Sequence, residues 1–102
     1  MIYDEVADII DTELDYQLRR WGKRKTLDAP MESVEHEVGT WLVLMDHYMK
    51  KAMTDLATSN SDVYAIEQVR KLVALGFSCM MQHGVRPRDV IDVTNARDGR
   101  PA

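Results

Sequence analysis

A chain of 102 residues has room for one domain, and its 45% hydrophobic fraction is that of a folded protein rather than a disordered one. The net charge of −4 argues against general nucleic-acid binding, which relies on broad basic surface. The single cysteine, Cys79, excludes an intramolecular disulfide and a cysteine-based zinc site.

The first predicted helix covers about residues 6–21. Its apolar residues recur at steps of three and four, which is the spacing of one helical face. They are Val6, Ile9, Ile10, Leu14, Leu18 and Trp21. Gly22 follows as the predicted stop, and Arg19 and Arg20 fall in the last turn, where the helix dipole favours cations.

The stretch from Arg19 to Lys25, here the basic segment, holds five of the chain's 13 lysines and arginines, whereas residues 1–18 hold none. Guanidinium groups bind phosphate oxygens in pairs, lysines add point charge, and an aromatic ring can stack a base. The segment therefore predicts a site for an anionic ligand; the alternative is a solvated helix end whose tryptophan belongs to the core. The candidate ligand-binding residues are Tyr16, Arg19, Arg20, Trp21, Lys23, Arg24 and Lys25.

The second predicted helix runs from about residue 33 to about residue 58, after a loop over residues 23–30. Pro30 suits a first helical turn, with Asp28 or Ser33 as the cap. One face carries a wide apolar stripe, made of Val34, Val38, Trp41, Leu42, Met45, Tyr48, Met49, Ala52, Met53 and Leu56. One small domain cannot cover a stripe this wide, so we expect a homo-oligomer.

Three carboxylates near the start of this second helix, Glu32, Glu35 and Glu37, are candidate metal ligands. Glu32 and His36 are four residues apart and would share a helical face. Carboxylate oxygens are the ligands that Mg²⁺ takes in proteins. The competing interpretation is that acidic residues in a first turn simply complement the helix dipole.

The third predicted helix opens near Asp62 and ends at His83 and Gly84. Its apolar positions are Val63, Ile66, Val69, Val73, Gly76, Phe77 and Met80. Three cations, Lys71, Arg86 and Arg88, lie on or just after its second half. They either join the basic segment in a composite cationic pocket across subunits or are scattered surface charge.

No segment alternates with period two for long enough to predict a strand. The expected fold is therefore all-α, with three helices of about 20–25 residues in an antiparallel, hairpin-type bundle. A short helical turn is expected after Pro87, around Val90 and Ile91. Residues 1–94 then form a single helical domain, and residues 95–102 a flexible polar tail.

The compartment follows from what the sequence lacks. Its first ten residues, MIYDEVADII, have neither the basic start nor the long apolar run of a signal peptide. No apolar stretch approaches the ~20 residues needed to cross a bilayer. We therefore expect a cytoplasmic protein with no membrane partner, and one lone thiol fits that reducing compartment.

One pattern runs from about residue 5 to about residue 88 and includes four stretches: ELDYQLRRWG (residues 13–22), the glutamate-rich start of the second helix, RKLVALG (70–76) and MMQHG (80–84). This pattern resembles small phage and prophage proteins of unassigned or MazG-like type. The resemblance implies an oligomeric all-α enzyme of an infected or lysogenic bacterium that uses Mg²⁺ to split nucleoside triphosphates into monophosphate and pyrophosphate. It also implies metal ligands on a Glu-Glu-x-x-Glu run and on a Glu-x-x-Asp run.

The two metal motifs of that family are only partly present. Glu32, Glu35 and Glu37 stand for the first motif, and the second begins at Glu67, where Arg70 occupies the aspartate position. A cation at this position competes with Mg²⁺, which needs several oxygen ligands. The resemblance combined with this departure favours binding over cleavage.

Three functions follow as hypotheses. The first is a protein that needs no cofactor and binds an anionic, nucleotide-derived molecule, sequestering a nucleotide signal of host defence without cleaving it. The second is an active Mg²⁺-dependent nucleoside triphosphate pyrophosphohydrolase. The third is an interaction module whose stripe of Met45, Met49 and Met53 binds a host protein.

Overall fold

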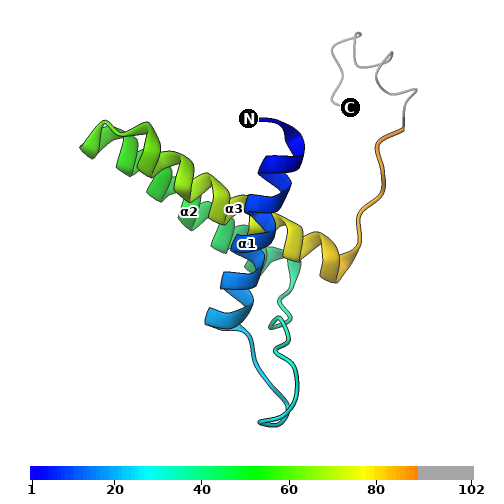
Figure 1. Cartoon of the computed structure of the whole chain (residues 1–102). Helices are drawn as coiled ribbons and strands as arrows, with labels where there is room; N and C mark the ends of the chain where they lie inside the picture. Colours follow the sequence, from blue (N-terminus) through cyan, green and yellow to red (C-terminus); the bar gives the residue numbers. More distant parts are fainter. Residues whose placement is uncertain (90–102) are drawn as a thin grey trace.

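The computed structural model describes residues 1–89, which contain three helices: α1 (Tyr3–Trp21), α2 (Val38–Ser59) and α3 (Asp62–His83) (Figure 1). The all-α prediction is confirmed. Within residues 1–89, the strand-like pairing is limited to an isolated antiparallel bridge between Lys23 and Glu32. The turn expected around Val90 and Ile91 and the tail expected over residues 95–102 lie outside the described residues.

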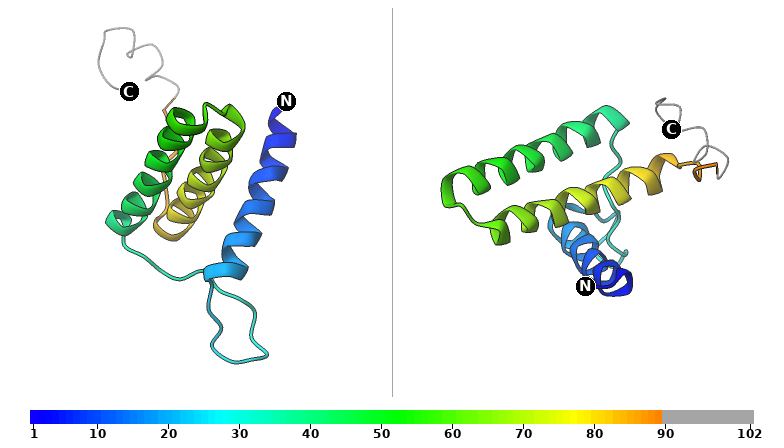
Figure 2. Two further views of the ribbon diagram at one scale, coloured as in Figure 1. Left: turned by 90° about the vertical axis from the view of Figure 1, so that its left-hand side faces the viewer. Right: turned by 90° about the horizontal axis from the view of Figure 1, so that it is seen from above.

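Helices α2 and α3 form an antiparallel hairpin (Figures 1 and 2). The hairpin turns at Asn60, whose φ of 51° lies in the left-handed region that asparagine tolerates. Ser61 then caps α3 by accepting a hydrogen bond from the Tyr64 N–H at 3.4 Å. In the part of the chain that the structure describes, none of the three helices has both the length and the apolarity that crossing a bilayer requires.

Helix α1 packs on α3 at an inclined angle and stays apart from α2 (Figure 2). Within residues 1–89, no Cα atom of α1 lies within 8 Å of a Cα atom of α2. A polar cluster holds α1 in place: the buried Glu13 carboxylate accepts hydrogen bonds from Arg70 Nε at 2.9 Å and from Gln17 Nε2 at 3.1 Å. Gln17 Nε2 also lies 3.1 Å from the Lys71 carbonyl oxygen, to which it donates. The two helices are therefore joined by charge and hydrogen bonds as well as by apolar contact.

The predicted end of the first helix and both ends of the third are confirmed. Helix α1 ends at Trp21, and α3 spans Asp62–His83 with Gly84 as its C-cap. Gly22 is the C-cap of α1, and only glycine fits there because there is no room for a side chain. A Cβ at this position would lie 2.3 Å from the Leu18 carbonyl oxygen and 2.9 Å from that of Glu32.

The predicted start of the second helix at about residue 33 is wrong, because α2 begins at Val38. The side chain of Gln82 on α3 captures the preceding backbone: its Oε1 accepts the His36 N–H at 3.2 Å and its Nε2 donates to the Val34 carbonyl at 3.0 Å. These backbone groups are thereby paired outside a helix. Pro30 consequently lies in the loop, neither Asp28 nor Ser33 caps the helix, and Glu37 is an N-cap without a side-chain hydrogen bond.

The apolar core is small. Among residues 1–89, the buried apolar side chains are Ile10, Trp41, Ala52, Ala74 and Leu75. Most of the predicted apolar face of α3 is not among them: Ile66 is 63% exposed and Phe77 is 42% exposed. The residues of α3 that are buried within one chain are instead Gln68, Ala74 and Leu75. A single chain therefore leaves much of the apolar face of α3 exposed to solvent.

Candidate ligand cleft between α1 and α2

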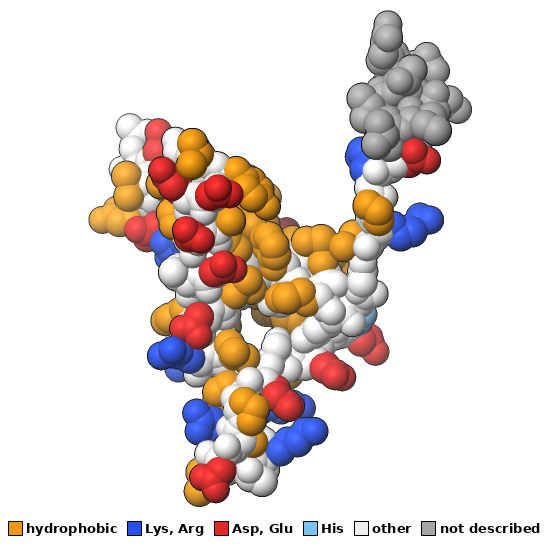
Figure 3. Space-filling model, turned by 45° about the vertical axis from the view of Figure 1, so that its right-hand side comes forward, with side chains coloured by type: hydrophobic (Ala, Val, Ile, Leu, Met, Phe, Trp, Pro, Cys, Tyr) orange, Lys and Arg blue, Asp and Glu red, His pale blue; other side chains and the backbone are white. Residues whose placement is uncertain are grey.

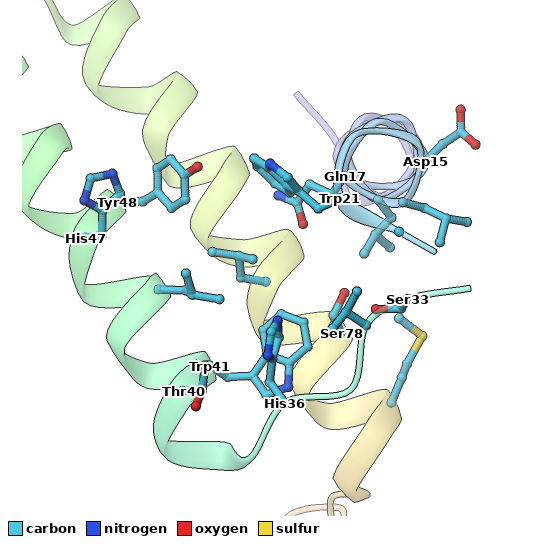
Figure 4. Close-up of a pocket in the computed structure, with 17 residues that line it drawn as sticks. Asp15, Gln17, Trp21, Ser33, His36, Thr40, Trp41, His47, Tyr48 and Ser78 are labelled. Atoms are coloured by element: carbon cyan, nitrogen blue, oxygen red, sulfur yellow. The ribbon is translucent and has the colours of Figure 1, made fainter. Parts of the chain in front are cut away.

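A cleft of about 710 Å³ opens between α1 and α2, with α3 along its floor (Figure 4). It exists because α1 contacts α3 without reaching α2. Its walls come from all three helices and from the segment before α2. The lining residues are Leu14, Asp15, Gln17, Leu18, Trp21, Gly22, Ser33, Val34, His36, Thr40, Trp41, Leu44, His47, Tyr48, Leu75, Ser78 and Met81.

Both tryptophans of the chain line this cleft. Trp41 is 4% exposed and donates its Nε1–H to Gln82 Oε1 at 3.0 Å, so its ring is fixed. Trp21 is 47% exposed at the end of α1. Figure 4 shows Trp21 and Tyr48 reaching toward one another from opposite walls. A flat aromatic ligand placed between them could stack on side chains from both α1 and α2.

Two histidines stand edge-on to these aromatic rings. The His36 ring lies 4.9 Å from that of Trp41 at an interplanar angle of 82°, and the His47 ring lies 5.0 Å from that of Tyr48 at 76°. The few polar groups of the walls come from different elements, among them Gln17 on α1, Ser33 before α2 and Ser78 on α3 (Figure 4). A mostly apolar cleft with a few convergent polar groups is the usual form of a small-molecule site.

The phenol of Tyr48 is uncharged at neutral pH. Burial raises the pKa of Tyr48, and the nearby Glu13 carboxylate and Tyr16 raise it further. The Lys71 Nζ lies 5.7 Å from the centre of the Tyr48 ring, within reach of a cation–π contact. Lys71 thus brings one positive charge to an aromatic residue of the cleft.

The basic segment lies where α1 ends, and Trp21 is its only member besides Gly22 that lines the cleft within residues 1–89. Arg19 pairs with Asp15, a rim residue, at 3.0 Å, and therefore neutralises a carboxylate that would repel an anion. Tyr16 contacts Trp21 edge-on, with the ring centres 6.4 Å apart. Arg20 is an exposed residue one position before Trp21.

The rest of the basic segment belongs to a loop closed at its neck. Lys23 and Glu32 exchange two backbone hydrogen bonds, of 2.9 and 2.8 Å. Arg24 donates to the Leu27 carbonyl at 3.2 Å and contacts the Met31 sulfur at 3.0 Å. Its guanidinium is therefore engaged in contacts within the loop. Lys25 is exposed.

The cations after α3 do not join the basic segment within one chain, and Figure 3 shows Lys and Arg side chains on the loop well apart from those on the segment that follows α3. Arg86 and Arg88 follow Gly84, where the chain leads away from the loop of residues 23–32 (Figure 1). Lys71 is separate from them, over the Tyr48 ring. Of these three predicted residues, Lys71 is the one that the structure brings beside a residue of the cleft.

The three candidate metal ligands precede α2 instead of sharing its first turn. Glu32, Glu35 and Glu37 are all exposed, and the backbone of Glu32 is paired with Lys23. Across residues 1–89, no three His, Cys, Asp or Glu side chains gather closely enough to hold a metal ion. The helical face that Glu32 and His36 were expected to share does not form.

Sequence reasoning missed most of the cleft. The sequence places Tyr48 and Trp41 in an apolar stripe, predicts His36 only as a neighbour of Glu32 in the metal cluster, and predicts no site role for Gln17 or His47. One signal was present: Gln17 interrupts the apolar face of the first helix, and polar residues on such a face often line a cavity or pair with a neighbour. Neither a protein-family model, nor a curated protein, nor a solved structure matches this chain.

Proposed function

We propose that this protein binds a small, anionic, nucleotide-like molecule in the cleft between α1 and α2. The observation that carries the proposal is the convergence of Trp21, Trp41 and Tyr48 on one apolar cleft beside positive charge. The base would lie between Trp21 and Tyr48. The phosphates would extend toward Lys71 and the cations around Trp21.

The size and lining of the cleft support a ligand of this class. Its volume of about 710 Å³ falls within the ~300–1,000 Å³ range of small-molecule sites. Stacking of one base on an aromatic side chain contributes about 1–3 kcal/mol and tolerates any base. Phosphate oxygens then need cations beyond the cleft lining. We assign this role to Arg20 and Lys23, which flank the lining residues Trp21 and Gly22 in the chain, and to Lys71 over the Tyr48 ring.

Binding without cleavage is the form of the proposal that the residues favour. A Mg²⁺-dependent pyrophosphohydrolase requires several oxygen ligands around its ions. Arg70 stands at the position where the resembled family has an aspartate, and its guanidinium is paired with Glu13. In the phage setting that the resemblance implies, such a protein would sequester a nucleotide signal of host defence.

The test uses the two tryptophans as built-in reporters. Titration with linear and cyclic nucleotides in the presence of Mg²⁺ should change the tryptophan emission, since both rings line the cleft. In parallel, the protein is removed by filtration before and after heating, and the nucleotides are quantified by mass spectrometry. A nucleotide that disappears and returns intact on heating supports sequestration. Monophosphate and pyrophosphate in its place would establish the hydrolase instead, and no change with any nucleotide would overturn the proposal.

A charge-matched pair of variants locates the site. Arg20→Glu combined with Lys23→Glu should abolish binding while the helical circular dichroism spectrum is kept. Lys50→Glu combined with Lys51→Glu makes the same change in net charge at exposed positions of α2 that do not line the cleft. Equal affinities in the two double variants would contradict the assignment of the phosphate subsite.

A further inference from the structure

An uncharged apolar stripe follows α3 on the side away from the cleft. Its members, at successive steps of three, four, four and three residues, are Ile66, Val69, Val73, Phe77 and Met80. At 100° per residue they lie about 100–180° around the helix axis from Ser78, the middle of the three α3 residues that line the cleft, and Phe77 is the member nearest to the cleft residue Met81. All but Val73 are exposed, and the stripe extends for about 21 Å at 1.5 Å per residue.

Helix α2 widens this stripe into a broader surface. A Cβ at Gly76 would lie 3.5 Å from the Met45 Cε, so α2 and α3 are in close contact next to the stripe. The apolar residues of α2 on the same side are exposed as well. We define the back face by Leu42, Met49, Met53 and Leu56 of α2 together with Ile66, Val69, Val73, Phe77 and Met80 of α3.

The area of the back face is too large for a typical monomer. Its exposed side chains present roughly 700 Å² of accessible surface, against ~300–600 Å² for the largest apolar patch of an ordinary monomer. A standard interface buries about 800 Å² on each partner. The back face therefore has the area that one stable protein–protein contact requires.

The spacing of the stripe is the same when read in either direction from Val73. Val69 and Phe77 are each four residues from Val73, and Ile66 and Met80 are each seven residues from it. If two α3 helices pack antiparallel about a two-fold axis at Val73, every stripe residue meets a stripe residue. Val69 then faces the partner's Phe77, a small side chain against a large one, and Ile66 faces the partner's Met80.

The charges of α3 permit this pairing. The same symmetry places Glu67 opposite the partner's Cys79, Arg70 opposite the partner's Gly76 and Lys71 opposite the partner's Leu75. Between residues 66 and 80, the pairing therefore brings no two like charges of α3 together. Pairing with a second copy requires this, because each charged residue must tolerate the same helix on the partner.

From the palindromic spacing, the area and the lack of facing like charges on α3, we infer that a second copy of this chain covers the back face, with α3 antiparallel to its mate across a two-fold axis at Val73. The two α2–α3 hairpins then form a four-helix arrangement. Each α1 and each cleft remain on the outside, so the inference is independent of the ligand proposed for the cleft.

The first experiment measures molar mass in solution. Wild-type protein at tens of micromolar should have twice the mass of one chain by sedimentation equilibrium, and Val69→Glu and Phe77→Lys should each reduce it to that of a single chain with the helical spectrum kept. Val43→Glu is the matched control, since it adds a charge at an exposed apolar position of α2 outside the back face. A monomeric wild type would overturn the inference and leave the face to another protein.

A mixing experiment tests the register. In a mixed pair, the carboxylate introduced at position 69 of one chain faces the ammonium introduced at position 77 of the other, so equimolar Val69→Glu and Phe77→Lys should recover the double mass. Val69→Glu mixed with Met80→Lys should stay monomeric, because Met80 faces Ile66 of the mate. Recovery in both mixtures, or in neither, would overturn the antiparallel pairing at Val73. Ligand binding by monomeric Val69→Glu would be unchanged, which separates this test from that of the cleft.

Discussion

Replacing Arg70 by methionine tests how α1 is held on α3. The substitution keeps a long flexible side chain but removes the guanidinium whose Nε lies 2.9 Å from Glu13 Oε1. Glu13 is 5% exposed, so its carboxylate would keep only the Gln17 amide as a partner. Loss of one partner from a buried ion pair costs about 3–5 kcal/mol. Because the Arg70 side chain is 35% exposed and the pair is partly hydrated, we expect the lower end, about 3 kcal/mol.

A double-mutant cycle separates the ion pair from side-chain packing. Glu13→Gln alone should cost about 1 kcal/mol, since a neutral amide still meets Gln17 and Arg70 can turn toward water. Glu13→Gln combined with Arg70→Met should lose clearly less than the sum, with a coupling of about 1–3 kcal/mol. Urea unfolding followed by circular dichroism, at one fixed protein concentration because assembly adds to apparent stability, gives the three values. A loss below about 1 kcal/mol for Arg70→Met, or additive losses, would refute the role given to this pair.

Three further predictions concern single residues. Gln82→Leu removes the hydrogen-bond partner of the Trp41 Nε1–H, the His36 N–H and the Val34 carbonyl. Urea unfolding should therefore show a loss of about 2–4 kcal/mol in the free energy of unfolding. An unchanged midpoint would contradict the role of the Gln82 side chain in holding the backbone before α2. Gly22→Ala should lower the melting temperature through an overpacking cost of about 1–3 kcal/mol, whereas Gly39→Ala, whose Cβ meets nothing within 4 Å, should not; equal shifts would refute the crowding at Gly22. Because the pKa of Tyr48 is raised on folding, the stability it contributes is present below the ordinary tyrosine pKa of about 10 and is lost as pH rises through the folded value. Tyr48→Phe should therefore lose less stability than the wild type between about pH 9 and 11, and parallel urea midpoints over that range would contradict the shift.

The elements that local sequence determines were predicted well. Helix α3 begins and ends where Asp62 and Gly84 indicate, and α1 ends at Trp21, the last residue of its apolar series, with Gly22 as its C-cap. The start of α2 was wrong because the decisive partner, Gln82, lies 46 residues from His36, and no local pattern reports such a capture.

The cleft shows a second limit of reasoning from periodicity. Steps of three and four indicate which residues share a helical face, but not what covers that face. Leu14, Leu18 and Trp21 form such a set on α1 and line an open cleft, while the stripe of α3 lies on the outer surface. Of the basic segment, only Trp21 and Gly22 line the cleft in residues 1–89, because the loop of residues 23–32 is closed at its neck.

The reciprocal hydrogen bonds between Lys23 and Glu32 also determine where the chain can tolerate insertions and deletions. They fix the distance between the two chain ends of the loop. Residues inserted or deleted near its tip, around Leu27, which is 90% exposed, should therefore leave Trp21 and His36 in place. Doubling the length of a flexible loop costs only about 0.6 kcal/mol in closure entropy. The tip is thus a natural position for grafting a peptide tag or a fluorophore while the cleft stays the same.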